Sequence, residues 1–176
     1  MRRLIPALCL LLLAAGGDLK PAIERLRAHR QDGMLIVSFE LTEVFDEPTV
    51  ERLESGLPLE FRYIVRLEHP RRMWFDRGLG RTTLDIIATY NAVTGEYHVN
   101  RKQDDKLIDS RAVTSTEDLQ RAMTMVSSLS AFEIAKPPGE RTFVRVRAEL
   151  GRRNLLLLFR RTITTGWARV RLDRPE

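Results

Sequence analysis

Apolar and polar residues alternate most regularly between residues 57 and 68. The apolar positions fall on one face of an extended segment and comprise Leu59, Phe61, Tyr63, Val65 and Leu67. The opposite face is mostly charged, with Glu60, Arg62, Arg66 and Glu68. A strand with one apolar and one polar face is typical of an antiparallel sheet that packs one side against a core. The pattern therefore predicts a central strand at this position.

The same two-residue period predicts strands on both sides of this segment. Asp32-Gly33 is a strong signal for a tight hairpin turn, because apolar alternation follows it over residues 34–44. Residues 22–30 are expected to form the paired strand, although the spacing of Ile23 and Leu26 also suits a helix. The other expected elements are a hairpin over residues 84–101, a weak strand over 107–113 and a last clear strand over 142–150.

Two segments carry signals for helices. Asp46 and Pro48 suit the start of a short helix that ends at Ser55-Gly56. Ser115 and Asp118 resemble a capping box at the start of the longer helix. Apolar residues then recur at helical spacing, namely Leu119, Ala122, Met123, Val126 and Leu129. The longer helix is therefore expected to continue to the last of these residues.

The predicted strands outnumber the helices, and their alternation favours antiparallel pairing. We therefore expect a mainly β fold, an antiparallel β-sandwich with one longer and one short α-helix that cover an end or an edge. The alternative is an α+β fold, in which the helix packs on one open antiparallel sheet. The length of 176 residues fits one domain with a sizeable core.

The first residues resemble an export signal. Arg2 and Arg3 precede a leucine-rich apolar run over residues 4–15, and small residues follow it. This run is shorter than the roughly 20 residues that span a bilayer. We therefore expect a signal peptide over residues 1–17 and a single β-rich exported domain over residues 18–176, located in the periplasm or the cell envelope. An uncleaved N-terminal membrane anchor is the alternative.

Cysteine content and charge narrow the range of partners. The single cysteine, Cys9, lies inside the predicted signal, so the mature domain would form no disulfide and would depend on packing for its stability. The chain has 29 basic and 24 acidic residues, and removal of Arg2 and Arg3 lowers its formal net charge from +5 to +3. Such a mixed surface lacks the concentrated positive charge of nucleic-acid-binding proteins, so we expect no nucleic acid partner.

No sequence motif indicates an enzyme or a cofactor. The three histidines, His29, His69 and His98, lie outside any recognised catalytic pattern, and the chain has no Gly-x-Ser-x-Gly motif. It also lacks the ligand spacings that are typical of zinc and calcium sites, and it lacks a glycine-rich phosphate loop. We therefore expect a non-enzymatic domain without a metal or cofactor.

Two clusters of basic and aromatic residues are the candidate binding residues. One lies in residues 69–81, which are expected to form a long exposed loop, and the other flanks the apolar run at residues 155–159. The candidates are Arg71, Arg72, Trp74, Phe75, Arg152 and Arg153. Arginine beside an aromatic ring suits an anionic lipid or wall surface or a protein partner. The alternative is a hairpin loop with a core-filling tryptophan, together with a buried edge strand flanked by solubilising arginines.

The order of these features resembles a family of exported bacterial proteins catalogued as domain of unknown function 4390. The resemblance rests on the predicted signal, the Asp32-Gly33 hairpin, the Gly56-Leu57-Pro58-Leu59 lead into the alternating strand, residues 90–99, the helix at Leu119 and a tryptophan near the end. It covers nearly the whole mature chain. The family has no established activity or catalytic residues, so the resemblance agrees with export and a β-rich fold and implies no mechanism.

These observations lead to three functional hypotheses. The first is a non-enzymatic exported domain of the bacterial envelope that binds an envelope or membrane-bound protein, or an anionic lipid or wall surface. The second is an envelope hydrolase whose site assembles from sequence-distant residues such as His69, His98 and a carboxylate. The third is a scaffold domain without a ligand.

Overall fold

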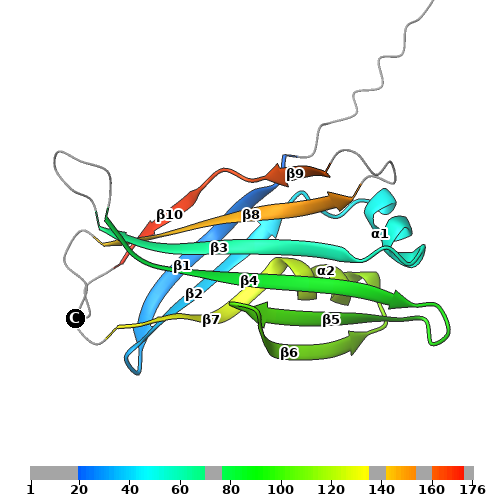
Figure 1. Cartoon of the computed structure of the whole chain (residues 1–176), viewed down its shortest axis with the longest axis horizontal. Helices are drawn as coiled ribbons and strands as arrows, with labels where there is room; N and C mark the ends of the chain where they lie inside the picture. Colours follow the sequence, from blue (N-terminus) through cyan, green and yellow to red (C-terminus); the bar gives the residue numbers. More distant parts are fainter. Residues whose placement is uncertain (1–19, 70–76, 135–141, 154–159, 173–176) are drawn as a thin grey trace, which may run out of the picture.

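Two antiparallel sheets pack face to face in the structure, a computed structural model that describes residues 20–69, 77–134, 142–153 and 160–172 (Figure 1). Within these ranges the larger sheet has seven strands in the order β10-β8-β3-β4-β5-β6, with β9 also paired to β8. The smaller sheet described has three strands in the order β1-β2-β7, and they cross behind the long strands in Figure 1. The mainly β fold and the predicted antiparallel sandwich with two helices are confirmed.

The strands differ widely in length. The larger sheet contains β3 (Leu59–His69), β4 (Arg77–Asn91), β5 (Glu96–Gln103), β6 (Lys106–Val113), β8 (Phe143–Arg153), β9 (Arg160–Thr164) and β10 (Ala168–Arg171). The smaller sheet contains β1 (Ala22–Gln31), β2 (Met34–Thr42) and β7 (Met125–Glu133). The expected strands near residues 34–44, 84–101, 107–113 and 142–150 are therefore all present.

The predicted central strand, β3, lies between β4 and β8 in the larger sheet. Its alternating apolar residues face the smaller sheet and are buried, namely Leu59, Phe61, Tyr63, Val65 and Leu67. Apolar residues of β2 meet them from the other side, and the ring centroids of Phe39 and Tyr63 lie 5.0 Å apart. The core therefore lies between the sheets, as the alternation predicts.

The hairpin of β1 and β2 is confirmed, so the helical alternative for residues 22–30 is wrong. Asp32 and Gly33 both have positive φ angles, of 49° and 78°. Two successive residues in the left-handed region form a turn whose twist matches that of the paired strands, which explains why the Asp-Gly signal is reliable.

Both predicted helix starts are confirmed. The Asp46 carboxylate accepts a hydrogen bond from the Thr49 amide at 3.0 Å and begins α1 (Glu47–Glu54). The Ser115 hydroxyl accepts one from the Asp118 amide at 3.1 Å and begins α2 (Thr116–Thr124). Tyr63 on β3 donates a hydrogen bond to the carbonyl of Met123 at 2.7 Å, which ties the last turn of α2 to the centre of the larger sheet.

The longer helix ends earlier than the apolar spacing predicts. It stops at Thr124, and Val126 and Leu129 belong to β7, where they pair with Phe39 and Val37 of β2. Val126 and Leu129 are three residues apart, which suits a helix, and an irregularity in the pairing of β7 with β2 brings both to the buried face of the strand. Pairing with β2 satisfies the backbone hydrogen bonds and buries both side chains, so tertiary contacts override the helical pattern.

The expected loop over residues 69–81 is also too long, because Arg77 to Arg81 already belong to β4 and pair with β3. Gly80 allows this strand to pass under β7, since a Cβ atom there would lie 2.9 Å from the ring of Phe132. Sequence patterns also missed β9 and β10, which are short and lie at the edge of the sheet beside β8. In the part of the chain that the structure describes, no helix is long and apolar enough to cross a membrane.

Candidate functional site

Most of the predicted binding residues lie outside the described structure. Arg71, Arg72, Trp74 and Phe75 fall in residues 70–76, and the apolar run at 155–159 lies outside it as well. The backbone of Arg152 and Arg153 ends β8 and pairs with Arg161 and Arg160 of β9. The side chains of Arg152 and Arg153 are not among those described. Binding through these six residues stays a prediction.

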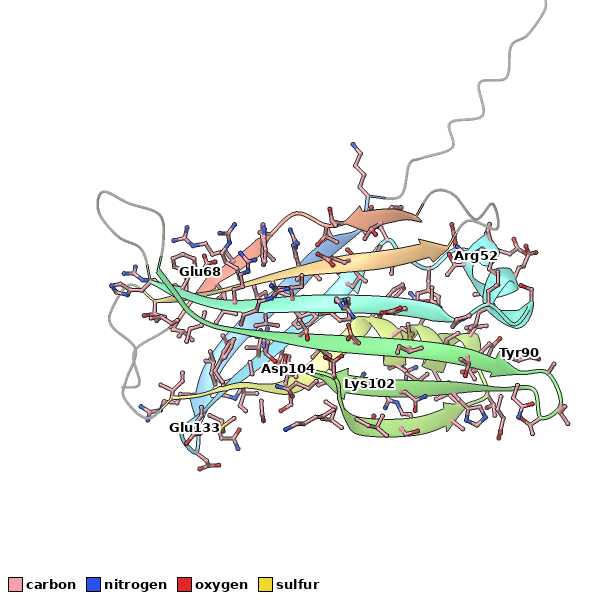
Figure 2. The ribbon with its side chains drawn as sticks, viewed as in Figure 1. Arg52, Glu68, Tyr90, Lys102, Asp104 and Glu133 are labelled. Atoms are coloured by element: carbon pink, nitrogen blue, oxygen red, sulfur yellow. The ribbon has the colours of Figure 1, made fainter. Side chains whose placement is uncertain are left out.

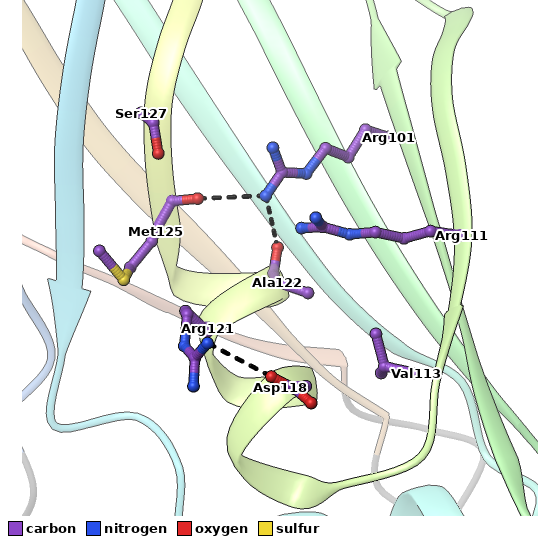
Figure 3. Close-up of a pocket in the computed structure, with 8 residues that line it drawn as sticks. All are labelled: Arg101, Arg111, Val113, Asp118, Arg121, Ala122, Met125 and Ser127. Atoms are coloured by element: carbon purple, nitrogen blue, oxygen red, sulfur yellow. Dashed lines mark hydrogen bonds and ion pairs between the residues drawn. The ribbon is translucent and has the colours of Figure 1, made fainter.

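A different basic site is present where the larger sheet extends beyond the smaller one. It is a cleft of about 250 Å³ between α2, β7 and the β5–β6 hairpin (Figure 3). Three arginines dominate its lining, which includes Arg101, Arg111, Arg121, Asp118, Val113 and Met125. We refer to this site as the arginine cleft.

Arg101 is the most constrained of these arginines. It follows Tyr97 and Val99 on the inward face of β5, so the strand directs its side chain toward α2. One of its terminal nitrogens donates hydrogen bonds to the carbonyls of Ala122 at 2.7 Å and Met125 at 3.1 Å, where α2 passes into β7 (Figure 3). These contacts hold the guanidinium across the base of the cleft.

The Arg101 guanidinium is poorly compensated electrostatically. Desolvation lowers its pKa below the ordinary value and repulsion from Arg111 lowers it further, while Asp109 acts in the opposite direction. Its Nε is buried without a hydrogen-bond partner, and no described carboxylate lies within 4.0 Å of it. Its hydrogen-bond partners are neutral carbonyls, so a positive charge remains available at the base of the cleft.

The other two arginines lie nearer to the solvent. Arg111 on β6 pairs with Val99 on β5, which places its side chain on the same face as Arg101, and its Nε lies 4.0 Å from the Asp109 carboxylate. Arg121 on α2 forms an exposed ion pair with Asp118 at 3.3 Å. Exposed ion pairs contribute little energy, so these acidic partners can be displaced by a competing anion.

The arrangement is suited to binding an anion. Guanidinium groups present paired donors that match a carboxylate or a phosphate, and a partly desolvated site strengthens such contacts. Val113 and Met125 add apolar surface beside the arginines. No group of histidine, cysteine, aspartate and glutamate among the described residues is arranged to hold a metal ion.

The turn between β5 and β6 positions the hairpin that carries Arg101 and Arg111. Asp104 lies in this turn, at the end of β5 (Figure 2), and its carboxylate accepts hydrogen bonds from the Thr82 hydroxyl at 2.7 Å and the Thr83 amide at 2.8 Å on β4. Desolvation opposes ionisation, but these hydrogen bonds outweigh it and lower the pKa of Asp104 below its ordinary value.

Asp104→Ala is expected to lower the free energy of unfolding by about 1 kcal/mol at pH 7, a modest value because the carboxylate is exposed. The folded-state pKa is depressed, so the stabilisation is complete above the unfolded pKa of about 4 and is lost as the pH falls through the folded value. The difference between wild type and Asp104→Ala should therefore shrink below about pH 4. Urea titrations at several pH values measure it.

Asp105→Ala is the matched control for this prediction. Asp104 and Asp105 both have positive φ angles, of 47° and 66°, so alanine is strained at either position. Among the described residues the side chain of Asp105 makes no hydrogen bond of the kind that Asp104 makes to β4. Equal losses in the two variants, or a loss in Asp104→Ala that does not depend on pH, would contradict a role for the carboxylate.

A second cluster of arginines surrounds Trp167 on the outer face of the larger sheet. The guanidinium carbons of Arg66, Arg145 and Arg147 lie 4.9, 4.9 and 4.8 Å from the centroid of the Trp167 ring. Arg145 also pairs with Glu68 at 3.2 Å, and Arg147 pairs with Glu149 at 2.6 Å. Because these charges have carboxylate and aromatic partners, we interpret the cluster as a support for the β9–β10 segment rather than as an anion site.

The structure keeps two of the histidines far apart. His69 pairs with Arg77 at the start of β4, whereas His98 pairs with Thr89 near its end. At about 3.3 Å per residue these positions are on the order of 40 Å apart along the strand. His69 and His98 therefore do not belong to one site, which removes the residue set named for the hydrolase hypothesis.

Arg101 could have been identified from the alternation pattern. Tyr97, Val99 and Arg101 occupy successive inward positions of one strand, and a charge at the end of an apolar face indicates a buried polar site. The pairing that brings Arg111 beside Arg101 has no such signal, because β6 is predicted only weakly. Arg121 lies on α2, whose position over the hairpin depends on the tertiary fold.

The fold and the site together define a β-sandwich domain with an arginine-lined cleft between α2, β7 and the β5–β6 hairpin. A family model described as domain of unknown function (DUF4390) matches residues 20–169, and the chain belongs to this family. The resemblance noted in the sequence is thus confirmed. Comparisons with curated proteins and with solved structures gave no match.

Proposed function

We propose that the protein is a non-enzymatic exported domain of the cell envelope that binds an acidic segment of a protein partner in the arginine cleft. The observation that carries this proposal is the environment of Arg101. Its side chain is half-buried beside Arg111 and donates hydrogen bonds to two neutral carbonyls. A carboxylate in the cleft would supply the opposite charge that the Arg101 guanidinium lacks, and it would compete with Asp109 for Arg111. Export rests on the predicted signal at residues 1–17.

The size and shape of the cleft favour a protein segment over the other proposed partners. A volume of about 250 Å³ is below the roughly 300–1,000 Å³ of typical small-molecule sites. It is large enough for one or two acidic side chains. A flat lipid or wall surface would make its main contacts with exposed groups, whereas Arg101 lies at the base of a recess and is reached by a side chain that enters it.

Photo-crosslinking in intact cells tests this proposal. A photoreactive amino acid in place of Ser127, which lines the cleft, is expected to yield a discrete crosslinked protein. Arg101→Met should lower that yield by roughly tenfold, the effect of losing a charge-assisted hydrogen bond of about 1.5–3 kcal/mol. Arg111→Met should lower it as well, and since Arg111 is the more exposed residue, this second variant is expected to keep the fold.

Arg27→Met is the matched control, because it removes the same charge from an exposed position on β1 in the other sheet. Its crosslinking yield should equal that of the wild type. A yield unaffected by Arg101→Met and Arg111→Met in folded protein would reject the cleft as the binding site. Retention on phosphatidylglycerol vesicles that depends on Arg101, with no protein crosslink, would assign the site to a lipid surface and overturn the proposal.

A further inference from the structure

The edges of the two sheets differ in how they are protected against pairing with another strand. Exposed edges carry unpaired N–H and C=O groups, and proteins block them with bulges, charges, short strands or covering groups. β1 has a bulge between Glu24 and Arg27, and the positive φ of Arg25, 51°, marks the distortion. At the edge of the larger sheet that lies beside β8, the strands β9 and β10 have only five and four residues. These edges are poorly suited to strand pairing.

The edge of β7 is covered by side chains from β5. Arg101 donates a hydrogen bond to the carbonyl of Met125, and the Gln103 amide donates one to the carbonyl of Ser130 at 2.9 Å. These bonds occupy carbonyls that would otherwise be available along the edge of β7. A strand added beside β7 would have to displace both side chains.

β6 is longer than β9 and β10, and none of the hydrogen bonds between the described residues covers its outer edge as Arg101 and Gln103 cover that of β7. It has eight residues without a proline, and within the described residues it pairs only with β5. Its side chains are exposed along nearly its whole length, including Leu107 at 60% and Ile108 at 53%. Its one irregularity lies opposite Arg101 and Lys102, at the end near the turn, and leaves the stretch from Asp109 to Val113 in regular register. β6 is therefore the open edge of the larger sheet.

We infer that an extended acidic segment of a protein partner adds to the larger sheet as a strand beside β6 and places its acidic side chains in the arginine cleft. This inference rests on the proposed function and specifies the form of the partner. The side chain of Arg111 points from β6 into the cleft, so every second residue of an added strand would share that face. Backbone hydrogen bonds would supply affinity, and contacts of these alternate side chains would supply specificity.

Charge decides between this occupant and a second copy of the chain. A second copy pairing through its own β6 would bring another Lys106 and another Arg111 to an edge that already borders three arginines. Its Asp109 would offset one of these charges at most. An acidic segment offsets the cleft arginines without adding basic groups.

Synthetic peptides test the backbone and the charge separately. The probe is a peptide of about eight residues, the length of β6, with alternating valine and glutamate. Two analogues keep its charge, one with N-methylated valines and one with N-methylated glutamates, and each lacks the amide donors of one strand edge. Strand addition predicts that one analogue binds at least tenfold more weakly than the parent peptide and that the other binds similarly, as measured by isothermal titration calorimetry.

Arg101→Met separates a failure of this inference from a failure of the proposed function. Weaker binding of all peptides to Arg101→Met, combined with equal binding of both analogues to the wild type, would support the cleft and overturn strand addition. Failure of the parent peptide to bind the wild type would also overturn the inference, while the crosslinking experiment still decides the proposed function. Sedimentation that shows a dimer unable to bind the peptide would assign the β6 edge to a second copy.

Discussion

Val65→Asp is expected to unfold the domain. Val65 has no exposed surface and lies at the centre of β3, where it pairs with Thr82 of β4 and Val146 of β8. An isolated ionised carboxylate at such a position costs several kcal/mol, and the loss of apolar contacts adds to this. Because domains of this size are stable by only about 5–15 kcal/mol, most of the stability would be lost. Circular dichroism during thermal unfolding measures the effect.

Val93→Asp is the matched control for this substitution. Val93 is 95% exposed in the turn between β4 and β5, so the same chemical change there should leave the melting temperature nearly unchanged. A Val65→Asp protein that is soluble and melts cooperatively near the wild-type temperature would show that this face of β3 does not form the core. The sandwich arrangement would then be wrong.

Trp167→Ala is expected to cause the second-largest loss, about 2–3 kcal/mol, from three cation–π contacts and the removal of apolar surface. Trp167 lies between β9 and β10 and connects this edge segment to Arg66 on β3 and Arg147 on β8. Arg66 and Arg145 occupy paired positions on neighbouring strands, where like charges repel each other. Without the ring their repulsion would be less compensated. Urea unfolding of both proteins measures the difference.

Trp167→Phe retains an aromatic face and should lose less than half as much stability as Trp167→Ala. The arginine cleft lies elsewhere in the fold, so peptide binding by folded Trp167→Ala should match that of the wild type. If both substitutions at Trp167 leave the stability unchanged, the cluster does not support the β9–β10 segment. A loss of peptide binding in folded Trp167→Ala would instead implicate this face in recognition.

Local sequence patterns pointed to other arginines than those that line the cleft. Arg71, Arg72, Arg152 and Arg153 attract attention because they adjoin aromatic or leucine-rich segments in the sequence. The alternation of β5 places Arg101 on the inward face, but only the tertiary fold brings the carbonyl of Ala122 on α2 against it. Sequence proximity reports only local contacts, whereas a cleft gathers residues from several elements.

The end of α2 illustrates the same limit for secondary structure. Val126 and Leu129 continue the helical spacing from Leu119, yet they lie on β7. Their partners, Phe39 and Val37, are about 90 residues away along the chain. A local pattern contains no information about such a partner strand, so it cannot weigh helix continuation against sheet pairing.

The sequence by itself determined the elements that depend on neighbouring residues. Two-residue alternation located β3, the Asp32-Gly33 turn located the first hairpin, and Asp46 and Ser115 located both helix starts, because each is governed by interactions within a few residues. Only the tertiary structure decided where α2 ends, which edge of the larger sheet is open, and that Arg101 and Arg111 lie together. These features depend on which distant strands pair, and pairing is selected by burial and hydrogen bonding over the whole domain.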